Sequence, residues 1–70
     1  MSIEFVAQRL GIGDVVLVSL SEQEEEVEAT VVRDIDRTAT AVRVTLRVEG
    51  HEDFVREWQI GDMVAVVRGP

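Results

Sequence analysis

Hydrophobic and polar residues alternate without a break from Val42 to Val48, which is the period of a strand with one buried face. Residues 27–31 keep the same alternation, with Glu28 and Thr30 on the polar side. The pattern predicts a long β-hairpin over residues 27–50. Its turn is expected to use the turn-prone residues between the two strands, which are Asp34, Asp36, Arg37 and Thr38.

A turn centred on Arg37 and Thr38 would fix the register of this hairpin. It places Val31 opposite Val44 on the buried face and Glu28 opposite Arg47 on the other. Arg33 conflicts with this pattern, because it falls on the same side of the strand as Val31. The register therefore predicts that the strand bulges or ends at Arg33.

Three further strands are expected. Residues 15–20 are apolar on both faces, which favours a central, covered strand. Residues 63–67 form a similar apolar run near the end of the chain. Between them, residues 54–58 predict a short strand that turns inward either Phe54, Arg56 and Trp58 or Val55 and Glu57. The segment 21–26, rich in glutamate, is interpreted as a loop.

The first ten residues fit a short helix. Ser2 could cap it, and its apolar residues share one face, namely Ile3, Val6, Ala7 and Leu10. A strand over residues 3–7 is the alternative, because this short segment fits both periods.

A short motif occurs twice. Ile12-Gly13-Asp14 and Ile60-Gly61-Asp62 each precede a valine-rich strand. We interpret both as equivalent turns, in which glycine supplies backbone freedom and aspartate binds the amides that follow it.

A strand opened by Gly-Asp, a long hairpin and the closing W-x-I-G-D-x-V-x-V of residues 58–66 together resemble the SH3-like barrels, including Tudor-like and KOW-like modules. The expected fold is therefore all-β: a single domain over residues 1–70, with a helix at 2–10 and a five-stranded SH3-like barrel at 13–68. The chain lacks the aromatic cages and the glycine pattern of these modules, so the resemblance leaves the ligand open.

The charged residues predict a strongly acidic surface. Fourteen acidic residues oppose seven basic ones, giving a net charge of −7, and every basic residue is arginine. This composition resembles the acidic, lysine-poor proteins of haloarchaea; a GC-rich genome is the alternative. Without cysteine, no disulfide can form. No apolar run is long enough for a membrane span, and residues 1–11 do not resemble a signal peptide, so we expect a cytoplasmic protein.

Catalytic and metal chemistry find little support. Glu49, His51, Glu52 and Asp53 bring one imidazole beside carboxylates, but a single histidine in a turn is a poor metal site. Gly11-Ile12-Gly13 lacks the third glycine of a dinucleotide loop. We therefore expect no cofactor, no metal and no enzymatic activity.

The candidate binding residues are Arg37, Arg43, Arg47 and Trp58. Strand parity places Arg43 and Arg47 on one face, where they are either ion-paired with neighbours such as Glu28 or free to bind a partner. Trp58 either anchors packing or contacts a ligand. A non-catalytic module that binds a protein partner or itself is expected first. The net charge makes a nucleic-acid partner the second choice.

Overall fold

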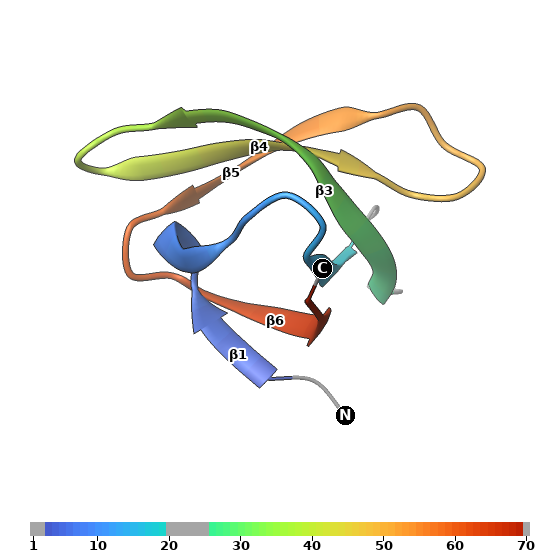
Figure 1. The fold of residues 1–70 in the computed structure, drawn as a ribbon, viewed down its shortest axis with the longest axis horizontal. Coiled ribbons are helices and arrows are strands. Elements are labelled where there is room, and N and C mark those ends of the chain that lie inside the picture. Colours follow the sequence, from blue (N-terminus) through green and yellow to red (C-terminus); the bar gives the residue numbers. More distant parts are fainter. Residues whose placement is uncertain (1–2, 20–25, 70) are drawn as a thin grey trace.

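The computed structural model describes residues 3–19 and 26–69, with the backbone alone at 34 and 35. Six strands and one 3-10 turn make up this part of the chain (Figure 1). In order they are β1 (Ile3–Val6), η1 (Ala7–Arg9), β2 (Val15–Ser19), β3 (Glu26–Arg37), β4 (Ala41–Arg47), β5 (Phe54–Gln59) and β6 (Met63–Arg68).

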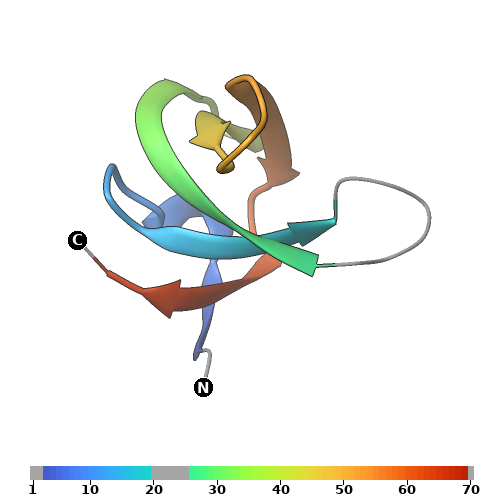
Figure 2. The same ribbon diagram turned by 90° about the vertical axis from the view of Figure 1, so that its right-hand side faces the viewer.

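The strands form one antiparallel sheet in the order β1-β6-β2-β3-β4-β5. Strong twist curls this sheet into a half-barrel, with β1 at one edge and β5 at the other (Figures 1 and 2). The all-β prediction is confirmed, whereas the expected count of five strands is wrong, because β1 adds a sixth.

The predicted N-terminal helix at residues 2–10 is wrong. Residues 3–6 form an edge strand on β6, with Ile3 opposite Val66 and Phe5 opposite Val64. Only a single 3-10 turn follows, and it buries Ala7. A short helix cannot persist alone, whereas pairing with β6 satisfies the same backbone groups and still buries apolar side chains. The proposed cap at Ser2 lies outside the described residues, as does most of the predicted loop at 21–26.

The long hairpin is confirmed, but its turn lies two residues later than expected. Thr38 donates its N–H to the carbonyl of Ala41 at 2.9 Å, and its hydroxyl accepts the Ala41 N–H at 3.0 Å. Asp34 and Asp36 therefore belong to β3. Two register shifts follow along this strand, so that Val31 lies opposite Leu46 instead of Val44.

The first register shift, between Val31 and Arg33, resolves the conflict at Arg33. A bulge adds one residue to the strand and so reverses the face of every residue after it. Arg33 is exposed as a result, while Val31 stays buried. The prediction of a bulge at this position is confirmed.

The core fills the concave side of the sheet. Every strand and η1 lie against it, and half-buried Phe5, Val27, Phe54 and Trp58 border it. Branched aliphatic side chains dominate because they pack well on a pleated surface. Its buried members are Ala7, Leu10, Val16, Val18, Ala29, Val31, Val42, Val44, Leu46, Val48, Val64 and Val66.

The two Ile-Gly-Asp motifs form matching turns, as predicted. Gly13 and Gly61 have positive φ angles of 98° and 95°, which glycine adopts at little cost. In each turn the aspartate carboxylate accepts the N–H of the residue three positions earlier, at 2.8 Å for Asp14 and 2.9 Å for Asp62. The bonded amide therefore precedes the aspartate, contrary to our expectation of a following one.

Candidate interaction surfaces

Three arginines project from the convex side of β3 and β4, and we call this surface the arginine face. Arg33 lies opposite Thr45, which in turn lies opposite Val55 on β5. One row away, Arg43 lies between Asp36 and Glu57. Arg47 lies at the far end of β4. Residues directly opposite on antiparallel strands share a face, so the arginine face consists of Arg33, Arg43, Arg47, Thr45 and Val55 with the acids beside them.

Arg47 is ion-paired, but with Asp53 instead of Glu28. Its Nε and Nη2 atoms each donate to one carboxylate oxygen at 3.0 Å, a bidentate arrangement. These hydrogen bonds hold the pKa of the Asp53 carboxyl below its ordinary value, and the positive charges of Arg47 and Arg33 add to the lowering. The same hydrogen bonds raise the pKa of Arg47. Glu28 contacts Arg68 instead, at 3.6 Å.

Arg43 has a different environment. Within the part of the chain that the structure describes, it forms no ion pair, although Asp36 and Glu57 flank it across both neighbouring strands. The electrostatic potential around a guanidinium between two carboxylates is close to zero or negative, which weakens its attraction for a phosphate. The arginine face is therefore not a positively charged surface.

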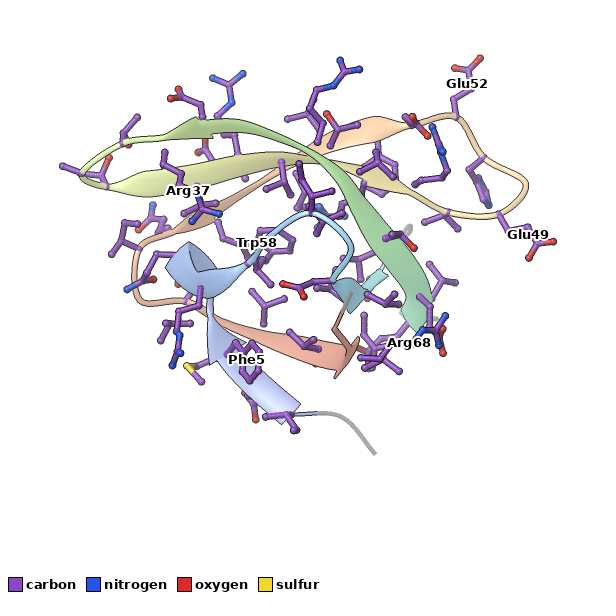
Figure 3. All side chains as sticks on the ribbon, viewed as in Figure 1. Phe5, Arg37, Glu49, Glu52, Trp58 and Arg68 are labelled. Atoms are coloured by element: carbon purple, nitrogen blue, oxygen red, sulfur yellow. The ribbon has the colours of Figure 1, made fainter. Side chains whose placement is uncertain are left out.

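Arg37 joins two segments that are distant in the sequence. Its guanidinium donates to the carbonyl oxygens of Gln8, within η1, and of Leu10, directly after it. Figure 3 shows this side chain beside the 3-10 turn. The contact ties the tip of the long hairpin to the segment after β1, so Arg37 stabilises the fold across the open side of the half-barrel.

Trp58 lies on the concave side of β5. Phe54, Arg56 and Trp58 are the half-buried residues of this strand, which resolves the predicted alternatives in favour of the first. Trp58 packs against the core and points into the space enclosed by the sheet (Figure 3). Arg56 lies 5.8 Å from the centre of the Phe54 ring and donates to the Ser19 carbonyl at 3.2 Å.

An open hollow of about 390 Å³ lies where β2, β3, β4 and β6 meet. Two arginines and two glutamates contribute equal and opposite charge to it, so it offers no net attraction for a simple anion or cation. Its lining residues are Val15, Glu28, Thr30, Arg47, Glu49 and Arg68.

The β4–β5 loop spreads its acids apart. Glu49 and Glu52 point away from each other into solvent (Figure 3), and Asp53 is held by Arg47. Across residues 3–19 and 26–69, no three carboxylate or imidazole side chains come together in a way that could hold a metal ion.

Exposed apolar side chains gather at the β1 edge of the sheet. Ile3 is 61% exposed, and Met63, which lies opposite Val6, is 53% exposed. The two side chains lie on opposite faces of the sheet, because Ile3 is opposite buried Val66 whereas Met63 is opposite Val6. We call this surface the β1 edge: strand β1 with Met63.

Sequence reasoning missed both Asp53 as the partner of Arg47 and the β1 edge. The sequence Ile3-Glu4-Phe5 has the alternation of a strand, but the same segment also fits a helical pattern. No local signal indicates the contact of Glu28 with Arg68, because these residues come together only when β2 pairs with both β3 and β6.

Comparison with family models, curated proteins and solved structures found no match. None of the described segments forms a helix with the length and apolar character needed to cross a lipid bilayer.

Proposed function

We propose that this chain is a non-catalytic interaction module of the SH3-like barrel type, and that it binds a protein partner or a second copy of itself. The observation that carries the proposal is the β1 edge, where the outermost strand of the sheet carries exposed Ile3 and is bordered by exposed Met63. Open strand edges with apolar side chains are the places where a sheet accepts another strand or an apolar surface.

The arginine face supports the alternative, a module that binds nucleic acid. Three arginines share one side of the sheet, as phosphate-binding surfaces require. Against it stand the bidentate pair of Arg47 with Asp53, the two acids beside Arg43 and the net charge of −7. Long-range repulsion of a polyanion outweighs a few neutralised cations, so protein binding is the better-supported function.

A photo-crosslinking amino acid placed separately at Met63 and at Val55 distinguishes the two functions. These positions are matched, because both side chains are apolar and about half exposed, at 53% and 52%. Irradiation in native lysate should join the Met63 probe to protein and leave the Val55 probe largely unreacted. Crosslinks from Val55 to nucleic acid, with none from Met63, would support the alternative and contradict the proposal.

The double variant Arg43→Gln/Arg47→Gln provides an independent test. If these arginines bind a partner, the substitution abolishes retention of that partner. For a nucleic acid, it also reduces the salt dependence of affinity by about one unit of slope for each phosphate that the protein no longer neutralises. We expect retention of the Met63-linked protein to be unchanged, with a slightly lower melting midpoint because the pair with Asp53 is removed. Abolished retention at an unchanged midpoint would favour the arginine face.

A further inference from the structure

The register of β1 shows which of its backbone groups face outward. Ala7 donates its N–H to the Asp62 carbonyl at 2.8 Å, which continues the pairing of Phe5 with Val64. Successive residues of an antiparallel strand alternate between the paired side and the opposite side. Glu4 and Val6 therefore direct their N–H groups away from β6, and Glu4 also directs its carbonyl away, toward the open edge.

The opposite edge of the sheet is better protected. Ile60 donates to the Thr40 carbonyl at 2.9 Å, so the outward-facing amides of β5 belong to Val55, Glu57 and Gln59. The Gln59 amide is already bound by the Asp62 carboxylate at 2.9 Å. Glu57 adds a charge to this edge, which is a usual means of preventing strand addition. Both described edges carry a glutamate and an exposed apolar side chain, but β1 leaves the Glu4 and Val6 amides open, whereas one of the three outward amides of β5 is already bound.

We propose that β1 pairs antiparallel with β1 of a second copy, so that the two half-barrel sheets join into one. This inference rests on the proposed function and specifies its partner. The pairing is two-fold symmetric, with Phe5 opposite Phe5 of the second copy. Val6 then donates to the Glu4 carbonyl of the other copy, on each side of the axis.

Charge and face select this register. A two-fold axis perpendicular to the sheet requires opposed residues to lie on the same face, so the axis passes through a pair of identical residues. An axis at Glu4 would oppose two carboxylates, which is destabilising. An axis at Phe5 opposes Glu4 to Val6 and Ile3 to Ala7. No like charges then meet within β1.

The net charge makes the pairing depend on salt. Each copy carries −7, so two copies repel one another in dilute buffer. At molar ionic strength the screening length falls to about 3 Å, and the repulsion between exposed charges largely disappears. We therefore expect the dimer to strengthen with added potassium chloride, in contrast to nucleic-acid binding, which salt weakens.

Val6→Pro tests the proposal without altering the fold. Val6 has φ −66° and ψ 143°, which matches the geometry of proline, and its N–H takes no part in pairing with β6. The preceding Phe5 lies in a strand, the conformation that proline favours before it. Val6→Thr, which retains the N–H and the branched side chain, is the matched control.

Sedimentation equilibrium in molar potassium chloride measures the outcome. The wild type and Val6→Thr should approach twice the monomer mass of 7.8 kDa as concentration rises toward millimolar. Val6→Pro should weaken association by more than about tenfold, because it removes two intermolecular hydrogen bonds and inserts a ring at the edge. A wild type that stays monomeric overturns the proposal, and so does a Val6→Pro protein that dimerises as tightly as the wild type.

Amide hydrogen exchange of the wild type gives a readout that needs no variant. Exchange at Glu4 and Val6 should slow as the protein is concentrated, while exchange at Val55 and Glu57 on the other edge should not change. Concentration-dependent protection at β5 with none at β1 would overturn the proposal. A monomeric wild type whose Met63 probe still crosslinks to a different protein would overturn the pairing of two copies and leave the proposed function standing.

Discussion

The turns at residues 11–14 and 59–62 have the same internal geometry. In each, the aspartate N–H donates to the carbonyl three residues earlier, at 3.2 Å for Asp14 and 3.0 Å for Asp62. The carboxylate accepts the amide of that same residue, and the glycine has a positive φ. Glycine at the third position is what a type II turn requires.

The surroundings of the two turns differ. Asp14 is 7% exposed, and the backbone of its turn is joined to β3 by two hydrogen bonds of 2.8 Å with Val31. Asp62 is exposed, and its turn is held by η1, through Ala7 N–H to the Asp62 carbonyl and Gly61 N–H to the Gln8 side chain at 3.0 Å. One turn is thus attached to the sheet, and the other to a segment outside it.

The two turns thus share their internal geometry but are expected to differ in how much they stabilise the fold. A three-letter motif followed by a strand was sufficient to predict two equal turns. The stability that each turn contributes depends instead on whether water can replace its hydrogen bonds, and the motif does not carry that information. Substitutions at matched positions of the two turns test this difference.

The largest difference is expected between Asp14→Ala and Asp62→Ala. Removing Asp14 leaves the partly buried Gly11 amide without its acceptor, which should lower the free energy of unfolding by about 1–3 kcal/mol. Water can reach the amide that Asp62 binds, so its removal should cost about 0.5 kcal/mol. Urea unfolding of both variants measures the difference. Equal decreases would show that burial does not decide the outcome.

The two glycines should behave alike. Alanine at Gly13 or Gly61 must adopt a positive φ, which costs roughly 1–2 kcal/mol at either position. No atom lies within 4 Å of a β-carbon added at Gly61, so strain of the backbone is the whole of its effect there. Thermal melts of Gly13→Ala and Gly61→Ala should therefore nearly coincide. A clear gap between them would break the geometric equivalence of the turns.

Arg37→Gln should loosen the second turn more than the first. The arginine holds the carbonyl of Gln8, whose side chain binds the second turn, and that of Leu10, which precedes the first. The first turn is in addition held by its two backbone hydrogen bonds to β3. We expect the free energy of unfolding to fall by about 1 kcal/mol. Hydrogen exchange should accelerate at Ala7 and Gly61 and remain slow at Gly13. Arg43→Gln, which removes a charge from the same hairpin without a described ion pair, is the control.

The smallest effect concerns Asp53, a third aspartate in a turn. Its pKa is lowered in the folded protein, so its pairing with Arg47 stabilises the fold above the ordinary carboxyl value of 3.8. That contribution disappears as the pH falls through the lowered pKa. Asp53→Asn should melt slightly below the wild type at neutral pH and coincide with it well below pH 3.8. A gap that widens in acid would contradict the assignment.

The strands were more predictable than their register. Alternation from Val42 to Val48 correctly assigns the faces of β4, because a two-residue period leaves no ambiguity along a strand of this length. The register of β3 depends on two bulges and on a turn made by Thr38, and the pattern indicated just one of these bulges, at Arg33. A register error of two residues leaves every side chain on the same face of the sheet. The core residues were therefore predicted correctly, whereas the partner of Arg47 was not.

The N-terminal segment was mispredicted for a different reason. Ile3, Val6, Ala7 and Leu10 fit a helical stripe, and Ile3 with Phe5 also fit a strand. Residues 3–6 form a strand because they pair with β6, which lies near the other end of the sequence. Such a contact leaves no trace in local periodicity, and the β1 edge could not be located without it.

The pairing of β1 with β6 also bears on how the chain folds. The first and last strands that the structure describes along the sequence, β1 and β6, are neighbours in the sheet, so the half-barrel cannot be completed until β6 is available. Closing so long a loop early is entropically costly, and sheets rich in distant contacts fold in milliseconds to seconds instead of microseconds. During synthesis β1 therefore stays unpaired until β6 has emerged from the ribosome.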